Sequence, residues 1–122
     1  MTWDSAVSYC ENLVEDNHDE WRMPNIDELR TTVKNCPQTE PGGSCKISKH
    51  CLAANCWNPD NCKCHGYGEI LGYYSKLGDP QNKLWSSSVV QGFYEKAFLV
   101  HFEHGAIVAD DKTGDNLVRC VR

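Results

Sequence analysis

The sequence predicts a single α+β domain in which two helices precede an antiparallel run of strands. Three observations predict this class. Apolar residues recur with a helical period near the N-terminus, and they alternate with polar residues toward the C-terminus. Between these regions lies a polar segment, residues 36–84, that contains six of the eight cysteines. Helices followed by an insert and then by strands are typical of an α+β domain.

The first helix is expected to begin after Thr2, a residue type that caps helix N-termini. Its apolar residues follow at steps of three, four and three: Trp3, Ala6, Cys10 and Leu13. These steps form one stripe of a helix, so Cys10 is predicted to point inward. The polar residues 16–19 should end this helix.

The second helix is predicted after a short extended piece, because Pro24 disfavours helix at the residue before it. Asn25 is the expected cap, and Glu28 can complete a capping box with it. The buried stripe is Ile26, Leu29 and Val33, and the helix should end before Pro37.

Four strands are expected in the C-terminal part. They cover residues 84–90, 97–103, 106–109 and 117–122. In the second of them Phe98, Val100 and Phe102 share one face, and Leu99 and His101 share the other. Val118 and Cys120 likewise share a face of the last strand.

The cysteine content indicates an exported protein, and no apolar run is long enough to span a membrane. The 122 residues suffice for one domain with a modest core. Eight cysteines favour disulfides and therefore an oxidising compartment. Met1 leads directly into a polar segment without the basic and apolar residues of a signal peptide. We therefore expect a domain of a longer exported precursor, with extracellular or cell-surface localisation.

The charge distribution argues against nucleic-acid binding. The net charge is −5, and residues 1–20 contain six acidic residues and no Lys or Arg. The insert differs, since residues 45–65 contain three lysines and two histidines against one acidic residue. An anionic ligand is compatible with that local excess.

Sequence alone leaves fifteen pairings open for the six insert cysteines. Cys62 and Cys64 are expected to have different partners, and Cys36 with Cys45 is our first choice because residues 41–43 let the chain turn back. Zinc is the alternative, with His50 and His65 nearby. The cysteine spacings lack the paired knuckles of structural zinc sites, which favours disulfides.

Four blocks resemble a known bacterial family. They are Trp3-Asp4 with Ala6 and Cys10, Trp21-Arg22-Met23-Pro24-Asn25 with Asp27-Glu28-Leu29, Trp85-Ser86-Ser87-Ser88, and Val118-Arg119-Cys120-Val121-Arg122. The family is DUF1566, also called the Lcl C-terminal domain family after the Legionella collagen-like protein. The resemblance implies a C-type-lectin-like fold and an exported or surface-attached protein, and the best understood member is an adhesin for sulphated polysaccharide. It also implies a bridge between Cys10 and Cys120, and core positions for Trp3, Trp21 and Trp85.

The insert is the expected recognition surface, because rigid scaffolds usually carry binding on their loops. Trp57 has two equally supported interpretations, a binding anchor or the centre of a small disulfide-bonded core. The predicted ligand-binding set is Lys46, Lys49, His50, Trp57, Asn58, Lys63 and His65, bordered by Tyr73, Tyr74 and Tyr94.

The motifs of metal-dependent or catalytic relatives are incomplete. Calcium-binding lectins follow a tryptophan with Asn-Asp, whereas Trp85 is followed by serines. The formylglycine-generating enzyme uses two redox cysteines near its C-terminus, and only Cys120 lies there. His101 and His104 could act as acid and base, but histidines at a strand end are more often surface residues. We expect no enzyme activity, no cofactor and no required metal.

Two classes of function stay open. The first is an adhesin-like module that binds a glycan or protein ligand at a surface. The second is a structural or assembly domain whose insert only stabilises the fold or supports homo-oligomerisation through the longer protein.

Overall fold

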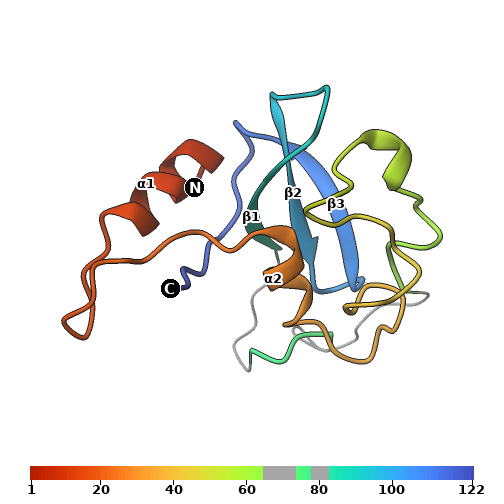
Figure 1. Ribbon diagram of the computed structural model, residues 1–122, viewed down its shortest axis with the longest axis horizontal. Coiled ribbons are helices and arrows are strands. Elements are labelled where there is room, and N and C mark those ends of the chain that lie inside the picture. Colours follow the sequence, from red (N-terminus) through yellow and green to blue (C-terminus); the bar gives the residue numbers. More distant parts are fainter. Residues whose placement is uncertain (65–73, 78–82) are drawn as a thin grey trace.

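The computed structural model describes residues 1–64, 74–77 and 83–122, and these residues form an α+β domain (Figure 1). Its elements are α1 (Trp3–Glu11), α2 (Ile26–Arg30), the 3₁₀ helix η1 (Ala54–Cys56), β1 (Lys83–Val89), β2 (Lys96–His101) and β3 (Ala106–Asp111). The strands form an antiparallel sheet in the order β1-β2-β3. The predicted α+β class is confirmed. None of the helices in the described ranges has the length and apolar character needed to span a membrane.

The caps that the sequence predicts begin both helices. The Thr2 hydroxyl accepts a hydrogen bond from the Ser5 amide at the start of α1. At the start of α2, the Asn25 side chain accepts from the Glu28 amide (2.8 Å) and the Glu28 carboxylate accepts from the Asn25 amide (2.9 Å). Both helices are shorter than their apolar stripes, since Leu13 and Val33 lie beyond their ends, and Val33 forms a β-bridge with Ser75.

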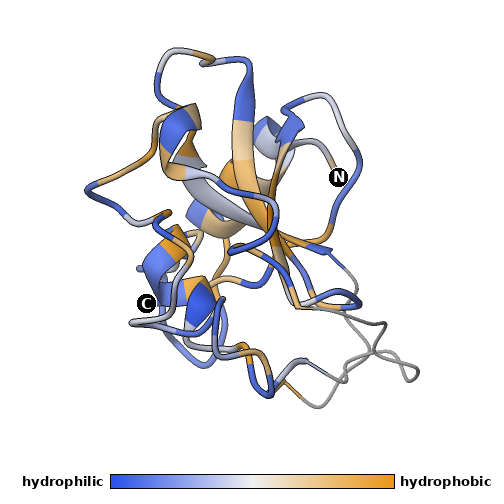
Figure 2. Cartoon of the chain, turned by 90° about the vertical axis from the view of Figure 1, so that its right-hand side faces the viewer, coloured by the Kyte–Doolittle hydropathy of each residue, from blue (hydrophilic) through white to orange (hydrophobic). Residues whose placement is uncertain are grey.

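The sheet separates two clusters of buried side chains. On β2, Phe98 and Val100 point to the cluster shared with α2 and the insert. Ala97 and Leu99 point to the cluster on the α1 side. Figure 2 shows apolar residues concentrated along the strands in the centre of the molecule. The alternation read from the sequence is therefore real, but both faces of β2 are covered.

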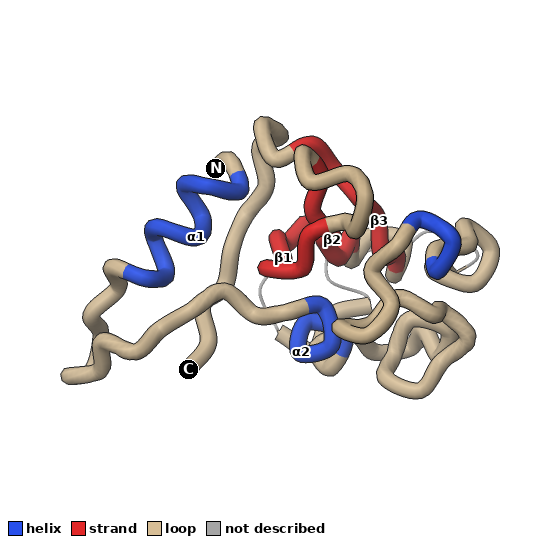
Figure 3. The backbone as a smooth tube through the Cα atoms, turned by 45° about the horizontal axis from the view of Figure 1, so that its top comes forward, coloured by secondary structure: helices blue, strands red, loops and turns tan. Residues whose placement is uncertain are grey.

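A disulfide fastens α1 to the C-terminal segment. Cys10 bonds to Cys120 across 110 residues, the pair that the family resemblance implies. In the chain-entropy model a loop of that size constrains the unfolded chain by about 4–5 kcal/mol. Trp85 is fully buried beside this bond, and Met23 packs in the same cluster. Figure 3 shows α1 and the C-terminal segment on the side of the sheet away from η1.

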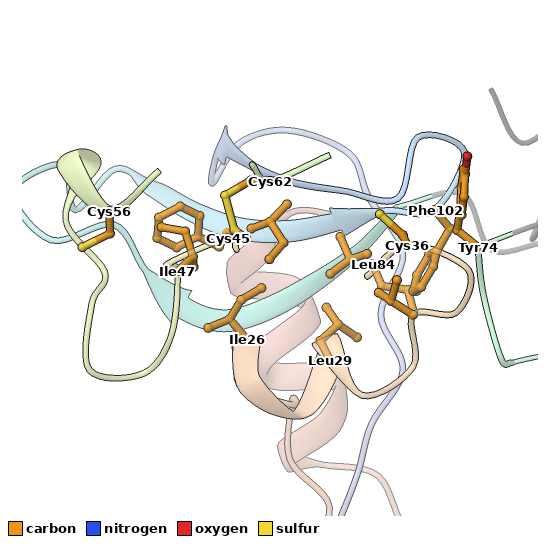
Figure 4. Close-up of a cluster of buried hydrophobic side chains, with 14 of the residues drawn as sticks. Ile26, Leu29, Cys36, Cys45, Ile47, Cys56, Cys62, Tyr74, Leu84 and Phe102 are labelled. Atoms are coloured by element: carbon orange, nitrogen blue, oxygen red, sulfur yellow. A yellow bond between two sulfur atoms is a disulfide. The ribbon is translucent and has the colours of Figure 1, made fainter. Parts of the chain in front are cut away.

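The insert supplies much of the opposite cluster. Figure 4 shows Cys45, Ile47 and Cys62 pointing among residues of α2 and the sheet, including Ile26 and Leu84. Ile47 has no exposed surface. The insert is thus part of the core as well as a surface loop.

Two sequence-based expectations about the scaffold are wrong. Residues 117–122 do not form a strand. Leu117 bridges to β1, whereas Val121 bridges to Arg22, so the segment changes partners and builds no continuous ladder. Trp21 is only half-buried and lies outside both clusters, with its indole N–H donating to the His18 carbonyl and the Arg122 guanidinium over its ring.

Candidate functional site

All eight cysteines are paired, and three disulfides hold the insert. The bonds are Cys36–Cys64, Cys45–Cys62 and Cys51–Cys56. Cys62 and Cys64 do have different partners. The first-choice pair Cys36–Cys45 is wrong, because the turn at 41–43 places the Cys45 amide against the Gln38 carbonyl (3.0 Å) and both cysteines reach across to the 62–64 segment. With every thiol oxidised, these cysteines are unavailable to zinc.

A buried arginine closes the base of the insert. Arg30, at the end of α2, is 5% exposed. Its guanidinium donates to the carbonyls of Thr39 (2.8 Å), Ile47 (2.7 Å) and Glu40 (2.8 Å), with a longer contact to Gln38 (3.4 Å). Burial lowers the pKa of Arg30, and nearby Asp27 opposes that shift. One side chain therefore binds backbone carbonyls on both sides of the turn at residues 41–43.

The insert also covers the free edge of β3. The Ile107 amide donates to the Cys62 carbonyl (2.9 Å), and the Cys64 amide donates to the His104 carbonyl (3.0 Å). The indole Nε1–H of Trp57 donates to the Ile107 carbonyl (2.7 Å). Unpaired edge strands invite association with other chains, and these contacts pair this edge internally.

Trp57 lies between two hollows. The first, here called the histidine hollow, has a volume of about 450 Å³. It is lined by Trp57, Pro59, Cys62, Lys63, Cys64, His101 and His104, together with the first three residues of β3. The second, here called the aromatic hollow, has a volume of about 200 Å³; its lining includes Ala54, Trp57, Phe93, Phe98 and Lys96. The ring is 38% exposed, so it is both anchored and accessible.

The β1–β2 loop completes this surface. The Gln91 amide donates to the Leu52 carbonyl (2.8 Å), which fastens the loop to the insert just before η1. Gly92 has a φ of +88°, a conformation that glycine adopts readily and that turns the chain here. The turn leaves Phe93 48% and Tyr94 69% exposed. Two exposed aromatic rings thus lie next to the insert in space, although they are far from it in sequence.

A third hollow, of about 340 Å³, lies where Lys49 and His50 meet Tyr94. Lys96, which lines the aromatic hollow, forms an ion pair with Asp111 (3.1 Å). Basic side chains therefore line both the aromatic hollow and the third hollow.

Two histidines and a glutamate meet at the end of β2. The rings of His101 and His104 are edge-to-face with centroids 4.7 Å apart, and His101 Nε2 is 3.6 Å from a Glu103 carboxylate oxygen. Gly105, with φ +58°, permits the tight turn that follows. Burial lowers the pKa of His101; His104 and Lys83 lower it further, and Glu103 opposes them. These effects together favour the neutral form of the His101 ring.

The predicted ligand-binding residues do not form one patch. Trp57 and Lys63 line the histidine hollow, whereas Lys49, His50 and Tyr94 line the third hollow. The remaining described members are Lys46, which is exposed but lines none of these hollows, and Asn58, whose side chain accepts from the Asp60 amide (2.8 Å) within a turn.

Tyr74 was predicted to border the ligand surface, but it does not. It is 5% exposed and packs in the core, where Gly105 comes so close that a side chain there would meet the Tyr74 ring. It therefore cannot border a ligand surface. His65 and Tyr73 lie outside the described residues.

Phe93, His101 and His104 line these hollows, although none of them belongs to the predicted ligand-binding set. The signal for Phe93 was present, because an aromatic pair directly after Gln91-Gly92 lies in a turn, where no strand buries it. The histidines were noticed, but nothing in the sequence places residues 57–63 against the end of β2.

The comparisons place the chain in one family. The sequence model of the Lcl C-terminal domain family matches residues 1–122. Searches of curated proteins and of solved structures returned no match.

Proposed function

The chain belongs to the Lcl C-terminal domain family, and from this premise we propose that it is an adhesin-like recognition module of a bacterial exported or surface protein. It binds a glycan or protein ligand through its insert. Four disulfides are compatible with an extracellular location, which this proposal requires. The C-type-lectin-like fold implied by the resemblance belongs to the same proposal.

The observation that carries the proposal is that Trp57 is both held in place and partly exposed. Its ring is partly exposed and opens onto two hollows, while its N–H is fixed to the Ile107 carbonyl and its neighbour Cys56 is bonded to Cys51. A side chain that is ordered before binding loses little conformational entropy when a ligand arrives. Exposed tryptophans of this kind are frequent anchors of interfaces.

The surroundings favour an anionic polysaccharide among the candidate ligands. Flat sugar faces can stack on Trp57 and Phe93, and the Lys63 ammonium at the histidine hollow can pair with a sulphate or carboxylate. Exposed charges are screened by salt, so binding should weaken as ionic strength rises. With few lysines per domain, strong attachment requires several domains acting together.

One observation favours the alternative, a structural domain without a ligand of its own. The insert contributes Cys45, Ile47, Cys56 and Cys62 to the core and covers the β3 edge. A domain that only stabilises a larger protein would need no more than that. It would not need Trp57 and Phe93 to line the same hollow with exposed rings.

The test is a glycan array followed by polysaccharide binding with the oxidised domain. Lys63→Glu should weaken binding to an anionic polysaccharide, and Lys46→Glu, with the same change of charge outside the hollows, should not. Trp57→Phe, which keeps an aromatic ring, should bind better than Trp57→Ala. Equal binding by the Lys63 and Lys46 variants, together with unaltered binding by Trp57→Ala, would favour the structural alternative.

A further inference from the structure

The cluster at the end of β2 brings together three side chains that bind metals. His101 and Glu103 follow one another closely in the chain, and His104 adds a second imidazole in the turn. One ligand atom from each lies within 4.8 Å of the others. Within the described residues, this is the group of at least three such side chains close enough to share an ion.

One nitrogen of this cluster is buried and unsatisfied. His101 Nε2 has no hydrogen-bond partner in the part of the chain that the structure describes. Its distance to the Glu103 carboxylate, 3.6 Å, is too long for a hydrogen bond. Buried polar atoms are almost always paired, and a bound ion would give this nitrogen the partner that the described residues do not supply.

The spacing suits a small ion. Zinc lies about 2.0–2.1 Å from nitrogen and carboxylate oxygen ligands, which places tetrahedral ligand atoms roughly 3.3 Å apart. The 3.6 Å between His101 and Glu103 is close to that value. His104 and Glu103 are half-buried. Small rotations of these side chains can therefore bring a ring nitrogen of His104 to the same ion as His101 and Glu103. Both histidines line the histidine hollow, which gives an ion access from solvent.

The donor set selects the kind of ion. Calcium and magnesium prefer sets of oxygen ligands, whereas two imidazoles and one carboxylate suit zinc and its neighbours in the transition series. Two His and one Glu with a fourth position left open is also a known zinc arrangement. Lys83 acts electrostatically on His101 and Lys63 lines the hollow, and both ammonium groups reduce the affinity for a cation.

We infer that His101, Glu103 and His104 bind a divalent transition-metal ion, with zinc as the best fit, and leave a coordination position open toward the histidine hollow. None of the three proposed ligands belongs to either core cluster. The inference does not depend on the proposed ligand recognition, because the ion would bind in the absence of any glycan.

The experiment is a titration of the oxidised, metal-free domain with zinc alone, followed by calorimetry and by NMR of the histidine rings. One zinc per chain is expected, with shifts at His101 and His104. His104→Gln and Glu103→Gln change half-buried side chains and should keep the fold while weakening affinity about 100-fold or more, since even outer-shell changes cost 10–100-fold. His50→Gln removes an exposed histidine outside the cluster and should leave affinity unchanged.

Calcium should cause no shift at either ring. Cobalt should give the visible absorption bands of a site with nitrogen and oxygen ligands, and these bands should be absent in His104→Gln. Zinc binding that survives in both His104→Gln and Glu103→Gln, or ring shifts confined to His18, His50 and His65, would overturn the inference. No zinc binding to the parent domain at millimolar concentration would overturn it as well.

Discussion

Replacement of Arg30 should destabilise the domain more than any other single change of a charged side chain in the described residues. The guanidinium is buried and donates three hydrogen bonds of 2.7–2.8 Å to carbonyls of the insert. In Arg30→Ala the Thr39 and Ile47 carbonyls lose this donor, whereas the Glu40 carbonyl still accepts from the Gly43 amide (2.9 Å). A buried group left without a partner costs about 1–3 kcal/mol, and water entering the space offsets part of that. We therefore expect a loss of about 3–5 kcal/mol in the free energy of unfolding.

Arg30→Lys should lose less, about 2 kcal/mol, because a single ammonium cannot reach all three carbonyls at once. Arg22→Ala is the matched control. Arg22 is half-exposed and pairs with Glu28 (2.6 Å), so its removal should cost at most about 1 kcal/mol. Guanidinium unfolding of the oxidised proteins, followed by far-UV circular dichroism, gives these differences.

Hydrogen exchange adds a local measurement. The Cys45 amide, which donates to Gln38, should lose protection in Arg30→Ala, whereas amides of β2 should keep theirs relative to global stability. A destabilisation by Arg30→Ala no larger than that by Arg22→Ala would refute the idea that Arg30 holds the insert.

Two further predictions concern the thiols and the pH dependence. Alkylation without reductant should leave the intact mass unchanged, since all eight cysteines are in disulfides; two or more labelled thiols would contradict the pairing. The hydrogen bond from Arg22, with help from the Asn25 amide, lowers the pKa of Glu28 below 4.5. Its stabilisation is therefore complete above pH 4.5 and is lost as the pH falls through the lower folded value. It should be small, about 0.2–1 kcal/mol, because the pair is exposed. Glu28→Gln should remove this acid-dependent part of the unfolding curve, and an identical pH profile in the variant would contradict the assignment.

The elements that carry local signals could be predicted from the sequence. The cap at Thr2 and the capping box of Asn25 with Glu28 depend on residues within one turn, and the alternation on β2 reflects burial on both sides of one strand. Helix length was less predictable, because Val33 is buried by tertiary contacts after α2 has ended.

The parts that could not be predicted depend on contacts between distant segments. Cys36 is 28 residues from its partner Cys64, and nothing local marks that choice. Arg30 reads as an ordinary surface residue at a helix end, since its carbonyl partners come from the insert. Trp57 could be assigned to neither core nor surface because it belongs to both, fixed at Ile107 and open on its other side.

The central claim is that the surface around Trp57 recognises a ligand, and binding by Trp57→Ala tests it most directly. The measurement is attachment of the folded, oxidised variant to the polysaccharide or protein ligand that the parent domain binds. Tyr9→Ala, which removes an exposed aromatic from α1, is the control. We expect Trp57→Ala to lose binding at least about tenfold, the effect of a hot-spot residue, while Tyr9→Ala binds normally. Normal binding by a folded Trp57→Ala domain would contradict it.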